Sequence, residues 1–250
     1  MIRVIKLGGR AQSAPELPKL LRDAAAAPDK QLVVVHGGGD DVTALQRQMG
    51  VEPIFVHGRR VTRPEDLDAV RMVLSGTVNK RLVAQGLTAG LRAVGISGED
   101  AYLLTARVTD PTYGRVGREV RADAAILRDL LAAGWTPFIS PLARDRQSAT
   151  GAGLNVNGDD AAAAIAESLG ADELCFVSDV PGVMEAGNTI PTLDRAGIDE
   201  LIARGVAQGG MRAKLEAALV TLHAGVRRVR IAPIAGITDL AAGTTIQSPA

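Results

Sequence analysis

Two glycine motifs, each at the end of an apolar segment, carry the first sign of chemistry in this sequence. Residues 2–5 lead into Lys6, Leu7, Gly8 and Gly9, and residues 32–35 lead into His36 and the glycines 37–39. Glycines where a strand ends let backbone N–H groups approach an anion, and Lys6 adds a positive charge. The pair therefore indicates a phosphate or another oxyanion at the carboxyl ends of neighbouring strands, although two ordinary turns between strand and helix would use the same residues.

Three polar side chains alternate along a short segment of the second half. They are Asn155, Asn157 and Asp159, and in an extended segment all three project to the same side. Two amides and a carboxylate on one face could orient a substrate and hold cations in place. A helix cap rich in Asn and Asp explains the same residues equally well.

A second lysine follows a pair of glycines near the end of the chain. Gly209 and Gly210 precede a predicted helix over 212–224, and Lys214 lies about one turn inside it. Helix N-termini bind phosphates through free N–H groups, and a lysine there can reach a transferring phosphoryl group. Lysine is rare in this chain, at five of the 28 basic residues, which favours a function for Lys6 and Lys214.

One further turn could contact a nucleotide. Asp179 lies in the segment 178–183, which closes an apolar strand with Pro181 and Gly182. Such a loop fits the ribose or base of a nucleotide. A plain Pro-Gly turn explains it nearly as well.

The elements that must position these residues alternate along the chain. Predicted strands cover 2–5, 32–35, 92–96, 136–140, 174–177, 227–232 and 244–247. Predicted helices cover 14–27, 64–85, 123–133, 161–168, 198–204 and 212–224, with another starting at Asp40 and the 64–85 helix capped by Thr62. A β-hairpin is expected over 97–120 and a loop over 144–153. Alternation of this kind predicts an α/β fold with a largely parallel sheet that helices cover on both faces.

Composition narrows the class of protein. At 250 residues the chain is long enough for a sizeable core in one α/β domain or two lobes. Acidic and basic residues balance at 28 each and aromatic residues make up 2%, which argues against a nucleic-acid surface. We expect no membrane span, because no apolar run approaches the roughly 20 residues that one needs. The start does not resemble a signal peptide and Cys175 is the single cysteine, so a cytoplasmic location is expected.

Eight motifs in order along almost the whole chain resemble those of the amino-acid kinase family. Besides the two opening glycine motifs they are Gly58-Arg59-Arg60-Val61-Thr62, Ser75-Gly76-Thr77-Val78-Asn79-Lys80, Gly114-Arg115-Val116-Gly117, Asn155-Val156-Asn157-Gly158-Asp159, Ser178-Asp179-Val180-Pro181-Gly182-Val183 and Gly209-Gly210-Met211-Arg212-Ala213-Lys214. The sequence departs from the resemblance after Val229, where the family usually has a strand ending in Asp-Gly. It also has Ala101 where relatives often have glycine.

The resemblance implies a role for each candidate residue. Lys6 and Lys214 would act on the phosphates and the transition state, with Asp159 organising them. Gly38 and Gly39 would supply backbone donors, Arg60 would bind the substrate α-carboxylate, and Asn155 and Asn157 would contact the same substrate. Gly8, Gly9, Asp179, Gly209 and Gly210 would line the nucleotide. ATP would carry the Mg²⁺, so no protein metal ligand is expected, and His36 is assigned a structural role.

The implied activity is ATP-dependent phosphorylation of the side-chain carboxylate of N-acetyl-L-glutamate, in arginine synthesis. An alternative is a kinase of carrier-linked α-aminoadipate or glutamate in lysine synthesis, for which Arg59, Arg60, Arg63 and Arg71 could form a basic rim facing an acidic carrier protein. A second alternative is a non-catalytic amino-acid sensor or scaffold.

The resemblance also implies an open, mainly parallel sheet between helical layers. It further implies two lobes on this one continuous sheet and a homodimer. Residues 1–170 would bind the amino-acid substrate and dimerise, and residues 171–250 would bind ATP. The apolar stripe of the 64–85 helix has the spacing of a symmetric helix contact. Arginine-inhibited relatives carry an extra N-terminal helix, whereas here the first strand begins at Ile2. We therefore expect a homodimer that L-arginine does not inhibit by that route.

Overall fold

One large sheet forms the centre of the molecule. The computed structural model describes residues 1–26, 29–56 and 59–247. In this part of the chain, eight strands follow the spatial order β14 (Thr192–Leu193), β16 (Thr244–Ile246), β15 (Arg228–Ala232), β11 (Glu173–Val177), β1 (Ile2–Leu7), β2 (Gln31–His36), β8 (Thr136–Ser140) and β5 (Ala93–Ser97). Every neighbouring pair is parallel except β15 and β16. The expected open, mainly parallel sheet is confirmed.

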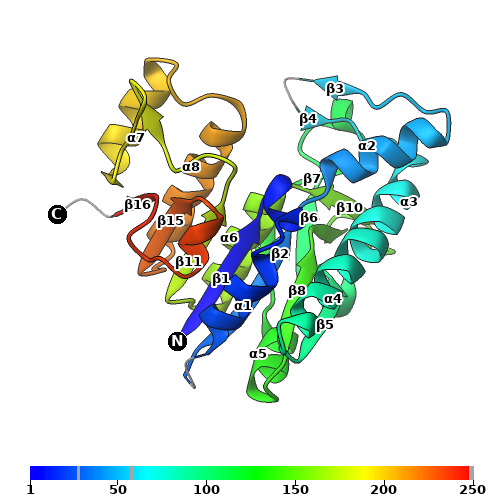
Figure 1. Ribbon diagram of the computed structural model, residues 1–250. Coiled ribbons are helices and arrows are strands. Elements are labelled where there is room, and N and C mark those ends of the chain that lie inside the picture. The colour runs from blue at the N-terminus through cyan, green and yellow to red at the C-terminus, as the bar shows by residue number, and fades with distance from the viewer. Residues whose placement is uncertain (27–28, 57–58, 248–250) are drawn as a thin grey trace.

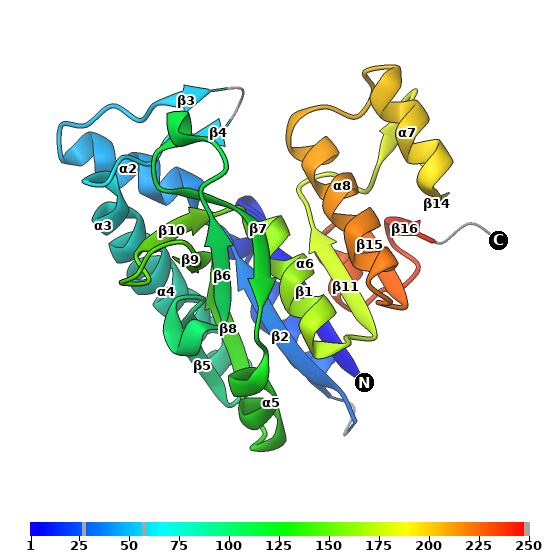
Figure 2. The ribbon, with the colours of Figure 1, turned by 180° about the vertical axis from the view of Figure 1, so that it is seen from behind.

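Helices cover both faces of this sheet (Figures 1 and 2). They are α1 (Leu17–Ala25), α2 (Gly39–Gln48), α3 (Asp66–Arg71), the π-helical η2 (Met72–Val78), α4 (Asn79–Thr88), α5 (Ala125–Ala132), α6 (Gly158–Leu169), α7 (Arg195–Ala203) and α8 (Gly209–His223). Short 3-10 helices are η1 (Arg10–Ser13), η3 (Asp100–Tyr102), η4 (Pro111–Tyr113) and η5 (Ile234–Ile237). Apolar residues of α1, α4 and η5 pack on one face, and those of α5, α6 and α8 on the other. No helix among these described residues is long and apolar enough to cross a membrane.

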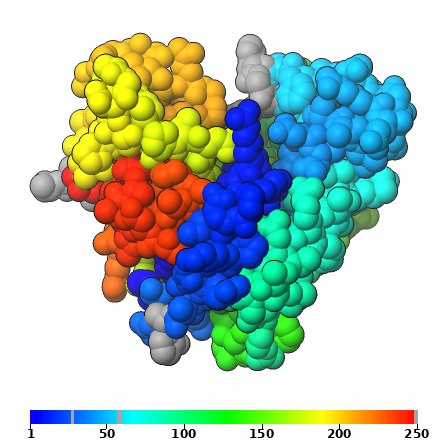
Figure 3. All heavy atoms as spheres, viewed as in Figure 1, coloured from blue at the N-terminus to red at the C-terminus, as the bar shows by residue number. Residues whose placement is uncertain are grey.

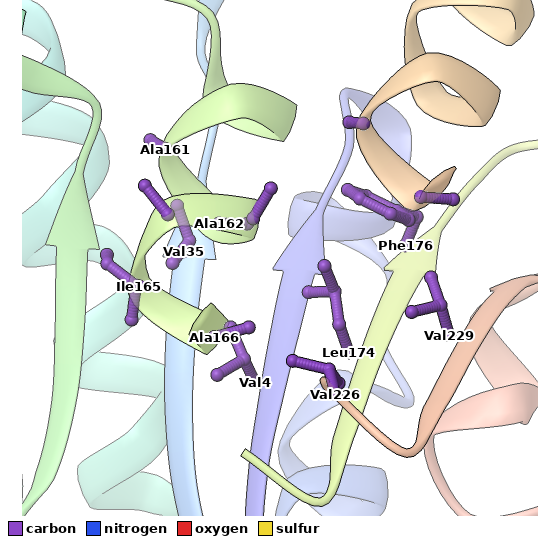
Figure 4. Packing of buried hydrophobic residues seen from close by; sticks show 14 of the residues in the cluster. Val4, Val35, Ala161, Ala162, Ile165, Ala166, Leu174, Phe176, Val226 and Val229 are labelled. Atoms are coloured by element: carbon purple, nitrogen blue, oxygen red, sulfur yellow. The ribbon is translucent and has the colours of Figure 1, made fainter. Parts of the chain in front are cut away.

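The strands are buried on both faces, which is why they read as continuous apolar runs. Val4 packs in the cluster under α6, whereas its neighbour Ile5 packs in the cluster under α1. Figure 4 shows Ala161, Ala162 and Ala166 of α6 above the sheet that carries Val4. These small side chains let α6 lie close to β1, the strand that carries Lys6.

Of the four strands in a second, smaller sheet, the sequence predicted the two that form a hairpin but not the other two. The β6 (Leu104–Arg107) and β7 (Val116–Ala122) strands pair antiparallel, as expected for a hairpin. With β9 (Leu142–Asp145) and β10 (Gly153–Val156) they close into a small barrel. The loop expected over 144–153 is wrong at both ends, because Arg144 and Gly153 pair with each other across β9 and β10. Two short pairs are β3 (Phe55–Val56) with β4 (Arg59–Arg60), and β12 (Met184–Glu185) with β13 (Asn188–Thr189).

The longest helical segment begins later than expected, and its middle part is a π-helix rather than an α-helix. It runs from Asp66 to Thr88 as α3, η2 and α4. Thr62 is not its cap, because the backbone of Thr62 bonds to the hairpin, accepting from Arg115 N at 2.6 Å and donating to Tyr113 O at 3.0 Å. The Asp66 carboxylate instead accepts the N–H of Arg63 at 3.1 Å.

The parts of the chain before and after residue 170 form different halves of the main sheet. Strands before residue 170 form the half from β1 to β5, and strands after it form the half from β11 to β14. In Figure 3 the C-terminal half (yellow to red) and the segments around α2 and α3 (blue to cyan) lie on either side of the β1 region. The junction between the halves is the β1–β11 pair.

Candidate active site

Three charged side chains from distant segments meet at the carboxyl edge of the sheet. Lys6 Nζ, near the end of β1, lies 2.8 Å from Asp159 Oδ1, in the first turn of α6. Lys214 Nζ, in α8, lies 3.2 Å from Asp159 Oδ2. Lys6 and Asp159 are 7% and 4% exposed. The structure therefore brings together the three residues expected to act on the transferred group.

The trio keeps a net positive charge. Burial by itself would raise the pKa of Asp159, but the neighbouring Lys6 and Lys214 ammonium groups lower it further than burial raises it. The pKa of Asp159 therefore lies below its ordinary value, and the carboxylate stays ionised at neutral pH. One carboxylate between two ammonium groups leaves one positive charge, which attracts an anion.

The start of α6 sets the direction of Asp159. Asn157 caps this helix, because its Oδ1 accepts the backbone N–H of Asp159 at 2.7 Å. The expected extended segment through Asp159 is therefore wrong: β10 ends at Val156, and Asp159 belongs to a helix. Asn157 Oδ1 therefore serves as the helix cap, and Asn155 donates from Nδ2 to Thr62 Oγ1 at 3.0 Å.

Gly158 belongs to the motif over residues 155–159, but sequence reasoning assigns it no role. A Cβ at Gly158 would lie 3.2 Å from Lys6 Cε and 3.3 Å from the His36 carbonyl oxygen. Both contacts are tighter than ordinary van der Waals packing. Glycine at this position therefore lets the first turn of α6 approach the ends of β1 and β2.

The first glycine turn and the Asp179 turn lie beside each other. Gly8 N donates to Val177 O at 3.2 Å, and a Cβ at Gly8 would stand 3.0 Å from that same oxygen. A Cβ at Gly9 would lie 4.0 Å from Asp179 Oδ2. Asp179 itself is exposed. Gly9 and Asp179 are therefore both exposed at this edge.

In the second glycine turn, the packing requires glycine at position 38, whereas the space around position 39 is open. Gly38 has φ +153°, and a Cβ there would meet Leu74 Cδ2 at 2.7 Å. Gly39 begins α2, where an added Cβ would meet no described atom within 4 Å. Gly38 therefore lets η2 pack closely, and Gly39 presents accessible backbone.

Gly209 and Gly210 begin α8 and do not merely precede it. The helix starts at Gly209 with Gln208 as the N-cap, so the expected start at Arg212 is late by three residues. A Cβ at Gly209 or Gly210 would meet no described atom within 4 Å. The open helix N-terminus therefore lies about one turn before Lys214, the geometry that suits a phosphate.

Arg60 is held by the first turns of α2. Its Nη2 donates to Gly39 O at 2.8 Å and to Thr43 Oγ1 at 2.6 Å, while Nη1 donates to Gln46 Oε1 at 2.5 Å. Gln46 Nε2 in turn donates to Asp66 Oδ1 at 3.0 Å. Thr43, Gln46 and Asp66 belong to no motif, so this network could not be predicted from the sequence alone.

His36 is a neutral structural residue. It is fully buried, its Nδ1 lies 2.8 Å from Gly37 O, and its Nε2 lies 3.1 Å from Asn79 Nδ2. A carbonyl only accepts, so this network assigns the proton to Nδ1 and leaves Nε2 to accept from the amide. Burial lowers the pKa of His36 to about 4.

The basic rim considered for a carrier protein is engaged within the chain. Arg63 Nε lies 2.7 Å from Asp66 Oδ2, and Arg71 Nη2 lies 2.7 Å from Glu99 Oε1. Arg60 has the α2 contacts given above. The side chain of Arg59 and all of Gly58 lie outside the described residues. Arg63 and Arg71 are therefore paired with carboxylates, whereas Arg60 donates to neutral groups of α2.

Residues 1–233 match the model of the amino acid kinase family, and the chain belongs to this family. Its relatives include acetylglutamate kinase of Chloroflexus aurantiacus, 42% identical over 95% of this chain and 94% of the relative. Acetylglutamate kinase of Solibacter usitatus is 44% identical over 92% and 90%. The structure is similar to that of smu.665 from Streptococcus mutans UA159, with a TM-score of 0.87, 31% identity and 98% of each chain covered.

Proposed function

We propose that the protein transfers the γ-phosphoryl group of ATP to the side-chain carboxylate of N-acetyl-L-glutamate, a step of arginine synthesis. Relatives at 42% and 44% identity over nine-tenths of both chains bear the name of this activity. The observation that carries the proposal is the pair of lysines that Asp159 holds at the end of β1. This reaction brings two anions together, the phosphates of ATP and the carboxylate of the substrate. The net positive charge of Lys6, Asp159 and Lys214 would reduce the repulsion between them.

The chemistry needs charge stabilisation and no general base. The acceptor carboxylate is already ionised at neutral pH and attacks the γ-phosphorus directly. A bond forms between a carboxylate oxygen and phosphorus, the bond to the bridging oxygen breaks, and ADP leaves with that electron pair. Charge spreads over the transferred group on the way. Lys6, Lys214 and backbone N–H groups at Gly9 and Gly39 are the donors that would stabilise it.

The acid at this site is not arranged to hold a metal by itself. Asp159 is paired with both lysines, and no cluster of three His, Cys, Asp or Glu side chains suited to a metal occurs within the described ranges. In this proposal Mg²⁺ arrives bound to the phosphates of ATP. When bound there, that ion supplies further neutralisation of phosphate charge.

The two halves of the sheet would divide the substrates between them. In this proposal residues 1–170 bind the amino-acid substrate, through Arg60, Asn155, Asn157, Gly38 and Gly39. Residues 171–250 bind ATP, through Asp179, Gly209 and Gly210, with Gly8 and Gly9 lying on the β1 side of the junction. The sheet order supports this division, because the main-sheet strands before residue 170 and those after it form separate halves that meet at the β1–β11 pair. We propose a cytoplasmic location, where ATP is available.

The Arg60 assignment has a direct test. A planar guanidinium can hold an α-carboxylate with two hydrogen bonds, and an ammonium group cannot. We expect Arg60→Lys to raise KM for N-acetyl-L-glutamate about tenfold and to leave KM for ATP within twofold, measured by steady-state kinetics. The matched control is Arg47→Lys, on the exposed face of α2. An equal loss for both substrates would assign Arg60 to structure alone.

A coupled assay of ADP release tests the function itself. The purified protein is given ATP, Mg²⁺ and either free N-acetyl-L-glutamate or α-aminoadipate linked to its acidic carrier protein. We expect ADP release and a hydroxylamine-trapped acyl phosphate with the free acetylated substrate only. Turnover with the carrier-linked substrate alone would establish the lysine-pathway activity instead, and no turnover with either would favour a sensor.

A further inference from the structure

The segment that follows β15 is fixed by a fully buried arginine. Arg230 donates from Nη2 to Gly236 O at 2.6 Å and from Nη1 to Ala242 O at 2.9 Å. It also donates from Nη1 to Asp239 O at 3.2 Å. Its Nε donates to Glu173 Oε1 at 2.6 Å, on the neighbouring strand β11. One side chain therefore binds three carbonyl groups of residues 236–242, which we call the β15–β16 loop.

This loop delivers a buried threonine to the turn that follows β11. Gly243, with φ +96°, ends the loop so closely against β15 that a Cβ would lie 2.3 Å from Ile231 O. Thr244, the next residue, is fully buried. Its Oγ1 accepts the N–H of Val183 at 2.8 Å and donates to Ile190 O at 2.6 Å.

The threonine fixes one end of the Asp179 turn. Ile190 N also donates to Val183 O at 2.9 Å, so both backbone polar groups of Val183 are bound. A Cβ at Gly182 would lie 2.7 Å from Thr244 Oγ1, which shows how closely this turn lies on Thr244. At the other end of the turn, Ser178 N donates to Ala232 O, the last residue of β15, at 2.9 Å. Residues 178–183 are thus anchored at one end to Ala232 of β15 and at the other end to Thr244 of β16, and the exposed Asp179 lies between these two anchors.

We propose that Arg230 and Thr244 are positioning residues for the nucleotide. They act by fixing the conformation of the 178–183 turn and do not touch the ligand. The inference rests on the proposed function, in which this turn contacts ATP. It goes beyond that function by assigning nucleotide affinity to contacts made behind the turn, on the side away from Lys6.

The test is Thr244→Val, which keeps the shape of the side chain and removes the hydroxyl. Val183 N and Ile190 O then lose their shared partner, and the turn is free to shift. We expect Kd for ATP, measured by isothermal titration in the absence of any acceptor, to rise about tenfold. KM for ATP should rise in parallel, while KM for N-acetyl-L-glutamate and kcat should stay within twofold.

Thr221→Val is the matched control. Thr221 is also fully buried, and its Oγ1 donates to Ala217 O at 2.7 Å within α8, away from the turn. This variant should lose a similar amount of stability and keep the wild-type Kd for ATP. Equal Kd values for wild type, Thr244→Val and Thr221→Val would overturn the proposal, and so would equal rises in Kd for both variants.

A second variant addresses the arginine. Arg230→Lys keeps the charge beside Glu173 but cannot bind all three loop carbonyls, so it should raise Kd for ATP in the same direction. A folded Arg230→Lys protein with wild-type affinity would remove Arg230 from the proposal. Failure of the proposed acceptor would look different, because wild-type protein would then bind ATP and show no turnover with N-acetyl-L-glutamate.

Discussion

At the scale of single residues, the site depends on one buried carboxylate that holds two ammonium groups in place. Asp159 is paired with both lysines and, in the proposed reaction, transfers no proton. Its effect is to bring Lys6 and Lys214 together without leaving two like charges unopposed in a buried place. A lysine at either position is therefore a preorganised donor.

Loss of Lys214 should be expressed in kcat. Preorganised donors of this kind contribute about 3 kcal/mol to transition-state stabilisation, so we expect Lys214→Ala to lower kcat by about 150-fold or more. The control is Arg212→Ala in the same turn of α8, because Arg212 is exposed and paired with Glu216. Steady-state kinetics with both substrates saturating gives the comparison. A near-normal kcat for Lys214→Ala would end its catalytic assignment.

His36 should make stability depend on pH. Its folded-state pKa of about 4 lies below the ordinary 6.5, so the unfolded chain binds its proton first as the pH falls. The contribution of the neutral ring is therefore fully present above pH 6.5 and is lost as the pH falls from 6.5 to about 4. The whole window corresponds to about 3 kcal/mol, of which about 2 kcal/mol is lost by pH 5.

Urea unfolding at pH 7 and pH 5 measures this loss. His36→Gln should remove about 2 kcal/mol of the decline in unfolding free energy between those pH values. His223→Gln is the control, because His223 is exposed at the end of α8. Equal declines for wild type and His36→Gln would show that His36 does not titrate in this window.

The site residues divide into those that sequence could and could not reveal. Lys6, Asp159 and Lys214 stood in short motifs at strand or helix ends, where parallel topology brings distant segments to one edge. Arg60 was also found in a motif. Its partners Gln46 and Asp66 lie inside helices with no distinguishing neighbours, and only packing of α2 on α3 brings them together.

At the scale of elements, the turn after β5 carries two residues in an unusual conformation. Ala101 and Tyr102 have φ +50° and +55°, in the left-handed region. A side chain in this region costs about 1 kcal/mol or more, because Cβ approaches the carbonyl oxygen. This is the position where the sequence departs from the resemblance by having alanine.

Glycine at this position should therefore stabilise the fold. We expect Ala101→Gly to raise the free energy of unfolding by up to about 1 kcal/mol, since the gain in the folded state exceeds the entropy that glycine adds to the unfolded chain. Ala84→Gly, at an exposed position inside α4, is the matched control and should lower it by about 1 kcal/mol. Two decreases of similar size would contradict the assignment of strain to Ala101.

Elements with strong periodicity were predicted, and those defined by long-range pairing were not. All seven predicted strands occur, because burial on both faces gives continuous apolar runs such as Leu174–Val177. The β9 and β10 strands are four residues each, polar in part, and owe their existence to partners in the hairpin. The same barrel displaced the cap of the long helix from Thr62, a tertiary effect that local sequence does not contain.

At the scale of the whole molecule, one end of the sheet offers a surface for a second copy. β5 ends the main sheet among the described strands, and α4 lies beside it at the outer edge (Figure 1). Met72 and Leu87, on the long helix from Asp66 to Thr88, are 53% and 56% exposed. The apolar stripe expected to make that contact is instead buried in the core of the chain itself, as Leu67, Val70, Val73, Leu74, Val78 and Leu82. We therefore propose that the outer face of this helix, with Met72 and Leu87, forms the seam of a homodimer.

Light scattering tests the seam. We expect wild-type protein to scatter as a dimer, and Met72→Asp combined with Leu87→Asp to scatter as a monomer, because charges would be buried in the seam. Val220→Asp is the control, since Val220 is an equally exposed apolar residue on α8, on the other half of the sheet. A dimer that survives the double change would place the contact elsewhere.

The central position of β1 also bears on the order in which the protein folds. β1 pairs with β2 nearby in the chain, but its other edge pairs with β11, in a register that joins Arg3 to Glu173. During synthesis that second edge stays without its native partner until about 170 further residues have emerged. An open, apolar parallel edge is prone to wrong pairing, so the nascent chain is most exposed to aggregation in this interval. Lys6 and Lys214 come together only after this interval. The active site is therefore completed late in folding, by the C-terminal half of the sheet.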